Sequence, residues 1–430
     1  MMRNTAQRWV SLLLAGLLIF GSVASFAQDD DAEDKKNTVM SERAYKRLSQ
    51  AHEAMGAEDY AGAITKLQAM EEMKLSDYER ALVLQTYGFI YAQQERYTEA
   101  LDYFERCIAL DALPLKAQQG MLYSLAGLYA NEQQWLKAVE TIERWLVAEP
   151  DPPADAYILI ASSYAELKRY RDALPWIEKA IASTNEPKES WYQLMVAIYF
   201  ELNEYRNAAR AARIMVSLWP EKKNYWEMLQ GAYQEIGDDF AAMSALELGY
   251  NQGVLTDEAN IVNLARMKMY LEVPYASAEL LSKEMEAGRV QRNKKNLELL
   301  LASWEAAREF ESAVKIIDEL AANSGDGKLY VRKAQAFSER NRWEDVVVAS
   351  DQALGRGGLS TKDEGTTLLL KGVALLELDQ HKPAQAAFER AVKVGGRSAE
   401  QARSWIQYLK DQAGTLSAGA PAAAGDSTGN

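Results

Sequence analysis

A column of small residues recurs ten times along this chain, and it limits the fold more than any other feature of the sequence. Small side chains at a fixed place in a repeated unit let two helices cross closely, since a larger side chain would push the helix axes apart. The column consists of Ala63, Ala100, Ala138, Ala173, Ala208, Ala242, Ala278, Ala313, Val346 and Ala384. We therefore expect repeated pairs of helices from residue 41 to residue 393.

Two columns of bulky residues accompany the small column. One lies at the expected start of each second helix: Tyr60, Tyr97, Trp135, Tyr170, Tyr205, Asp239, Tyr275, Phe310, Trp343 and His381. The other lies in each first helix: Ala54, Tyr91, Tyr129, Tyr164, Tyr199, Tyr233, Tyr270, Trp304, Phe337 and Leu375. The three columns together predict an all-α chain of helix-turn-helix units, in which each unit needs its neighbours to bury its apolar face.

The stretch from Leu84 to Pro150 shows this pattern most fully. It contains Leu84, Tyr87, Gly88, Tyr91, Tyr97, Ala100 and Phe104, then Leu122, Leu125, Ala126, Tyr129, Trp135, Ala138, Ile142 and Pro150. These residues and their spacing resemble the tetratricopeptide repeat, a helical hairpin of about 34 residues. The resemblance implies a right-handed superhelical solenoid of about ten units. Because Asp239 replaces an aromatic residue and Pro274 shortens the next turn, we expect a local change of superhelical twist there.

The N-terminal segment differs from the repeats. Residues 1–27 carry Arg3 and Arg8, an apolar run over residues 10–20 and a small-residue site ending at Ala27, which together predict a cleavable signal peptide and export to the periplasm. An uncleaved membrane anchor is the alternative, although the apolar run is shorter than the roughly 20 residues that a spanning helix needs. After cleavage we expect no membrane-spanning segment.

Three further segments complete the expected domain organisation. Residues 28–40 are rich in aspartate and glutamate and predict a disordered acidic leader. Residues 394–412 predict a helix that caps the open end of the solenoid, with Trp405, Ile406 and Leu409 on its apolar side. Residues 413–430 are mostly alanine, glycine and serine, which predicts a disordered tail.

The charge and the cysteine content restrict partners and cross-links. The formal net charge is −14, and loss of Arg3 and Arg8 with the signal peptide makes it −16. This balance argues against a nucleic-acid or anionic-membrane binder, which needs a concentrated basic surface, and favours protein partners. The single cysteine, Cys107, excludes an intrachain disulfide, and we expect it to be a small buried core residue.

The sequence offers no assembled catalytic or metal-binding constellation. Its two histidines, His52 and His381, lie in the first and last units, and we expect His381 to be a packed ring. Without clusters of histidine and cysteine we expect no metal site and no cofactor. The glycine-rich stretch over residues 355–358 lacks the Gly-Lys-Ser/Thr ending of a nucleotide loop and indicates a linker. We therefore expect a protein that is not an enzyme.

The remaining expectation is binding. In tetratricopeptide proteins the first helices line a concave groove, so the resemblance implies a candidate groove formed by Gln85, Phe89, Gln93, Tyr123, Asn131, Ser162, Gln193, Phe200, Glu227 and Gln234, with Ile158 and Glu235 beside them. Amides can bond to the backbone of an extended peptide, and aromatic faces offer contact area at low entropic cost. The alternative is that these are ordinary helix-packing or exposed residues.

The C-terminal segments resemble a narrower group. The stretches Leu368–Leu375, Ala386–Ala391 and Gln401–Leu409, together with the signal sequence, resemble periplasmic tetratricopeptide proteins associated with the TonB, ExbB and ExbD energy-transduction systems of Gram-negative bacteria. This resemblance implies an accessory role in TonB-dependent outer-membrane uptake, with TonB, ExbB or ExbD components or an outer-membrane protein as partners. A scaffold for exopolysaccharide export or outer-membrane assembly, and a carbohydrate-binding protein, are the alternatives.

Overall fold

The structure is a computed structural model that describes residues 38–322, 325 and 327–418. The expected signal peptide and most of the acidic leader lie outside these residues. Every regular element in the described residues is an α-helix, and none of these helices is both long and apolar enough to cross a bilayer. The chain forms two compact units that meet in sequence at Trp219 and Pro220, and each is described separately.

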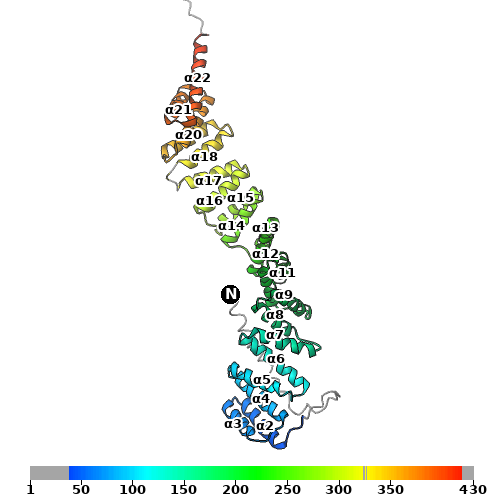
Figure 1. The fold of residues 1–430 in the computed structure, drawn as a ribbon. Coiled ribbons are helices and arrows are strands. Elements are labelled where there is room, and N and C mark those ends of the chain that lie inside the picture. The colour runs from blue at the N-terminus through cyan, green and yellow to red at the C-terminus, as the bar shows by residue number, and fades with distance from the viewer. Residues whose placement is uncertain (1–37, 323–324, 326, 419–430) are drawn as a thin grey trace, which may run out of the picture. The chain divides into compact units, whose positions relative to one another are not determined.

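The first unit is a stack of helical hairpins (Figure 1). Its helices are α2 (Glu42–Gly56) and α3 (Tyr60–Glu71), α4 (Asp77–Gln93) and α5 (Tyr97–Ala109), α6 (Leu115–Asn131) and α7 (Trp135–Ala148), α8 (Ala154–Glu166) and α9 (Tyr170–Ala182), and α10 (Glu189–Glu201) and α11 (Tyr205–Leu218). Each hairpin packs on the next along the chain. The predicted all-α repeat solenoid is therefore confirmed.

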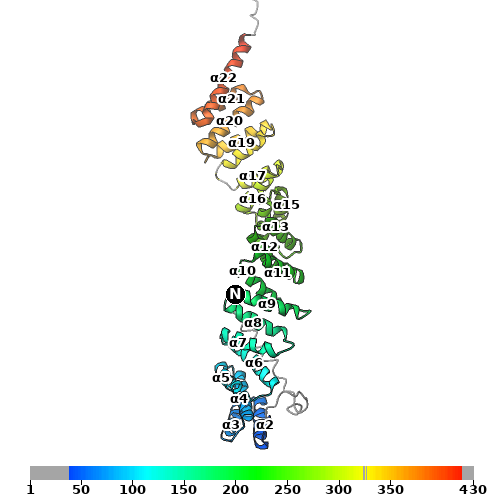
Figure 2. The ribbon, with the colours of Figure 1, turned by 45° about the vertical axis from the view of Figure 1, so that its right-hand side comes forward.

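The second unit continues the same construction (Figure 2). Its helices are α12 (Lys223–Ile236) and α13 (Asp239–Asn251), α14 (Glu258–Tyr270) and α15 (Pro274–Glu286), α16 (Lys294–Ala306) and α17 (Phe310–Ala322), α18 (Lys328–Ser338) and α19 (Trp343–Arg356), α20 (Thr361–Glu377) and α21 (His381–Val394), and finally α22 (Gly396–Ala418).

The last helix, α22, contacts both α20 and α21. It continues past the expected capping segment to Ala418, since the chain has no proline between Gly396, where the helix begins, and Pro421. The first residues of the expected tail are therefore helical, and residues 419–430 lie outside the described residues.

One residue with a positive φ angle forms the turn of every hairpin, two residues before the second helix begins. These turn residues are Glu58, Glu95, Gln133, Lys168, Asn203, Gly237, Glu272, Arg308, Asn341 and Asp379. Gly237 has a φ of 78°, and the other members have φ values between 55° (Asn341) and 60° (Glu58). Because the turn is the same each time, it fixes the register of every second helix on its first helix.

The predicted small column is buried throughout. Ala313 is 4% exposed, and the other members, from Ala63 to Ala384, are 0% exposed. Cys107 is also buried, as expected, and its thiol donates to the Ala81 carbonyl oxygen at 3.1 Å. The close crossing of the two helices therefore has the predicted cause in every hairpin except that of α14 and α15, where the register differs.

In the hairpin of α14 and α15 the predicted register is wrong. Counting four residues back from the turn residue Glu272 gives Lys268, which is 7% exposed, whereas the predicted column member Tyr270 is 71% exposed. Counting five residues forward gives Ser277, which is 0% exposed and donates to the Ala265 carbonyl oxygen at 2.8 Å. The prediction aligned this hairpin on its aromatic residues, Tyr270 and Tyr275. Helix α15 instead begins at Pro274, because proline fits the first turn of a helix.

Candidate protein-binding surface

The predicted groove residues all lie on first helices of hairpins, but they are divided between the two units. In the first unit are Gln85, Phe89 and Gln93 on α4, Tyr123 and Asn131 on α6, Ser162 on α8, and Gln193 and Phe200 on α10; in the second unit are Glu227 and Gln234 on α12. The first set is called the first-helix surface below. Ile158, expected beside it, is only 9% exposed and belongs to the core.

The amides of this surface are partly accessible. Gln93 is exposed at the last residue of α4, and Asn131 is half-buried at the last residue of α6. Gln85 and Gln193 are half-buried within their helices, and the Gln193 side chain donates to Glu189 at 3.2 Å. These side chains can offer both donors and acceptors to a peptide backbone.

The aromatic members are held by packing against second helices. The Phe89 ring meets Phe104 edge-on at 5.2 Å between centroids, and the Tyr123 ring lies 4.8 Å from that of Trp145. Phe200 packs on Tyr205 in the same way as Phe89 on Phe104, at 5.7 Å. All three predicted rings are half-buried, so they are fixed in position while part of each remains exposed.

Burial also affects the hydroxyl group of Tyr123. It raises the pKa of Tyr123 to about 12, and the negative charge of Asp155 on α8 acts in the same direction. Tyr123 is therefore a neutral hydrogen-bonding group at physiological pH.

Between these side chains the surface is open. Gly127, Ser162 and Ala197 occupy equivalent places in α6, α8 and α10, each six residues before the turn residue of its hairpin. A Cβ atom added to Gly127 would meet nothing within 4 Å. Helix α6 contacts α8, and α8 contacts α10. Three neighbouring first helices therefore carry a small residue at the equivalent place, and the place at Gly127 is open.

A ladder of polar contacts between successive hairpins is a feature that the sequence analysis missed. Tyr129 donates to Glu105, Tyr164 donates to Glu143, and Lys268 donates to Glu247 at 2.7 Å. In each case a first helix bonds to the preceding second helix. The signal was an acid that recurs five residues after the small column: Glu105, Glu143, Glu178, Glu247, Asp318, Asp351 and Glu389.

The electrostatic effect of this ladder is visible at Glu105. The hydrogen bond from Tyr129 lowers the pKa of Glu105, and Lys137 lowers it further. Burial raises the pKa of Tyr164 to about 12, and its bond to Glu143 adds to this effect. Glu105, Glu143 and Glu247 thus join hairpins to one another, and they lie on second helices and not on the first-helix surface.

The two histidines have different surroundings. His52 is half-buried in α2, its Nε2 lies 3.1 Å from the Thr86 hydroxyl oxygen, and burial lowers its pKa. His381, which begins α21, is exposed and not the packed ring that the column predicted, because the first residue of a helix can point into solvent. In the described part of the chain, no group of three or more His, Cys, Asp or Glu residues is placed to hold a metal ion.

Two segments of the chain match family profiles described as tetratricopeptide repeat. They are residues 81–112, which include α5 and most of α4, and residues 154–186, which include α8 and α9. Together with the hairpins, these matches support the tetratricopeptide repeat family for this chain. Among curated proteins, none is significantly similar to it in sequence.

Several solved structures are similar to the chain. One is a tetratricopeptide repeat protein from Parabacteroides merdae, with 19% identity, 61% of this chain and 99% of that chain covered, and a TM-score of 0.36. Another is YrrB, described as a TPR protein with an unusual peptide-binding site, with 15% identity, coverage of 43% and 90%, and a TM-score of 0.35. A third is MamA, with 17% identity, coverage of 40% and 91%, and a TM-score of 0.35.

Proposed function

We propose that this protein is a non-catalytic periplasmic scaffold that binds an extended segment of a partner protein on the first-helix surface. The observation that carries the proposal is the open site at Gly127, where small residues on α6, α8 and α10 lie between fixed aromatic rings and accessible amides. Repeat solenoids commonly bind partners on such extended faces. The tetratricopeptide repeats of the chain support a role in protein–protein interaction.

The proposed setting is a TonB-dependent outer-membrane uptake system. It is supported by the resemblance of the C-terminal segments and by the signal-like N-terminus, which predicts export. A strongly acidic scaffold also suits a basic, neutral or extended protein partner.

Photo-crosslinking in cells tests the binding surface. A photoreactive amino acid at Tyr123 or Phe200 should capture a protein segment, whereas one at Val147, which is 90% exposed on the second helix α7, should not. A Gly127→Leu substitution should abolish the crosslinks, because its side chain begins in open space at this site and would take up the room of a bound chain. Crosslinks that arise only from Val147 would show that the partner binds the other side of the unit.

The same crosslinked samples test the setting. Mass spectrometry should identify a TonB, ExbB or ExbD component or an outer-membrane protein, and osmotic shock should release the protein with the periplasmic contents. Capture of a polysaccharide-export or outer-membrane-assembly component would keep the scaffold function and reject the proposed uptake system.

A further inference from the structure

The turns of two neighbouring hairpins in the second unit expose an unusual number of aromatic side chains. Phe240 is 64% exposed, Tyr270 is 71% exposed and Tyr275 is 52% exposed. In these hairpins Asp239 and Pro274 begin the second helices, where most other hairpins have an aromatic residue. The aromatic residues of these hairpins thus stand one or two positions away from the packed columns, and their side chains are exposed to solvent. Such exposed apolar patches mark interaction sites.

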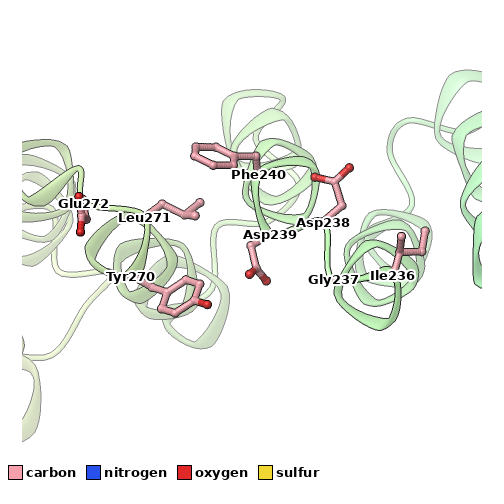
Figure 3. A pocket seen from close by; sticks show the side chains of 8 residues that line it. All are labelled: Ile236, Gly237, Asp238, Asp239, Phe240, Tyr270, Leu271 and Glu272. Atoms are coloured by element: carbon pink, nitrogen blue, oxygen red, sulfur yellow. The ribbon is translucent and has the colours of Figure 1, made fainter.

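Two of these rings border a pocket of about 560 Å³ that lies between the turns. Figure 3 shows Phe240 of α13 and Leu271, which follows α14, pointing toward each other, with Asp239 and Tyr270 beside them. Helices α13 and α14 contact each other within the second unit. The apolar side chains of the pocket therefore come from two adjacent hairpins.

All the charged residues that line this pocket are acidic. Asp238, Asp239 and Glu272 line it, and none of its lining residues is cationic. In the described residues none of these three carboxylates is in an ion pair, whereas Glu247, Glu284 and Glu319 of the same unit are paired with Lys268, Arg289 and Arg292. Asp238 has a structural role, because it accepts from the Ala241 amide at the start of α13. Asp239 and Glu272 remain available to a cation.

We propose that this aromatic turn patch, defined as Phe240, Tyr270, Leu271, Asp239 and Glu272, docks a partner-protein segment that carries a lysine or arginine next to an aromatic or large aliphatic side chain. The apolar side chain enters between Phe240 and Leu271, and the cation meets Asp239 beside Tyr270, while Glu272 adds negative charge at the other side of the pocket. The exposed face of Tyr270 adds a cation–π contact. This inference goes beyond the proposed function, because the patch lies in the other unit and is independent of the first-helix surface.

Fluorescence polarisation with the full chain tests the proposal. The probe is a fluorescein-labelled peptide with alternating lysine and phenylalanine, compared with peptides in which glutamate replaces lysine or serine replaces phenylalanine. The lysine–phenylalanine peptide should bind best. Phe240→Ser with Tyr270→Ser, and separately Asp239→Asn with Glu272→Gln, should each weaken its binding by roughly tenfold or more.

Matched controls separate the patch from general exposure. Leu248→Ser changes a side chain on the same helix α13 that is 54% exposed but does not line the pocket, and it should leave binding unchanged. Thermal melting checks that each variant is folded, and the charge variant tests the site even if the aromatic variant unfolds. Equal binding of the glutamate peptide, or binding unaffected by both double variants, would overturn the proposal. Self-association that the aromatic variant abolishes, without binding of the lysine peptide, would also overturn it and assign the patch to a second copy of the chain.

Discussion

Gly88 of α4 lies directly against the ring of Phe104 of α5: a Cβ atom on Gly88 would be 2.2 Å from the Phe104 Cε1 atom. The same relationship recurs in the last hairpin between Gly372 and Phe388, where the distance would be 2.4 Å. Both phenylalanines are buried, with exposures of 1% and 0%. The glycine is therefore required for the ring of the second helix to lie on the first helix.

The first prediction compares two glycines inside helices. Gly88→Ala and Gly127→Ala both gain about 1 kcal/mol of helix propensity, but only the Gly88 variant must displace a buried ring. Overpacking of this kind costs about 1–3 kcal/mol. We expect Gly127→Ala to raise the free energy of unfolding measured in urea, and the value for Gly88→Ala to lie about 1–3 kcal/mol below that for Gly127→Ala. Equal midpoints for the two variants would contradict the contact.

The second prediction concerns the turn residues. Lys168 has a φ of 58°, a left-handed conformation that costs a residue with a Cβ atom roughly 1–2 kcal/mol. Lys168→Gly removes this strain and adds an entropic cost of about 0.5–1 kcal/mol, so we expect a net gain in unfolding free energy of up to about 1.5 kcal/mol. Arg169→Gly, at a φ of −87°, is the comparison and should destabilise the protein, because it relieves no left-handed strain and also removes the ion pair with Asp172. A lower melting temperature for Lys168→Gly would argue against strain at the turn.

The sequence predicted the hairpins well because their signals are strictly periodic. Tyr97, Trp135 and Tyr170 each begin a second helix as predicted, and Ala100, Ala138 and Ala173 are fully buried after them. The prediction failed where the aromatic residue does not stand at the interior position that the turn sets. Tyr270 was selected because it is aromatic, but only the position of the turn residue Glu272 shows that Lys268 occupies the interior place.

The binding surface could be predicted only in part. Helix membership follows from the repeat, and all the predicted groove residues do lie on first helices. Which unit a helix joins depends on long-range packing, so the separation of Glu227 and Gln234 from the first-helix surface had no local signal. The exposed patch at Phe240 did have a local signal in the sequence, since Asp239 stands where an aromatic residue was expected.

The third prediction concerns the buried lysine. Lys268 is 7% exposed, and its ammonium group donates to Glu247, whose side chain is 40% exposed. Glu247→Ala removes this partner, and leaving a buried hydrogen-bonding group unpaired costs roughly 1–3 kcal/mol, or more when the group is charged. We expect a corresponding loss in chemical unfolding, and a much smaller loss for Glu279→Ala, which changes an exposed glutamate on α15.

A second background isolates the pair. When Lys268→Met is already present, Glu247→Ala should cost no more than Glu279→Ala, since there is no buried charge to leave unpaired. A cost of Glu247→Ala that is the same in both backgrounds would mean that the ion pair does not hold these hairpins together.

The last prediction is a pH dependence at Cys107. Burial raises the pKa of the Cys107 thiol to about 12, whereas a thiol in the unfolded chain ionises near pH 8.5. Between these values the folded protein holds a proton that the unfolded chain has lost, so Cys107 makes the unfolding free energy fall as the pH rises. Cys107→Ala should therefore show a shallower alkaline loss of stability than the unchanged protein between about pH 9 and pH 12.

At pH 8 a thiol reagent should label Cys107 only in denaturant, because the folded thiol is buried and protonated. Rapid labelling of the folded protein, or identical alkaline slopes for the two proteins, would show that the thiol reaches solvent.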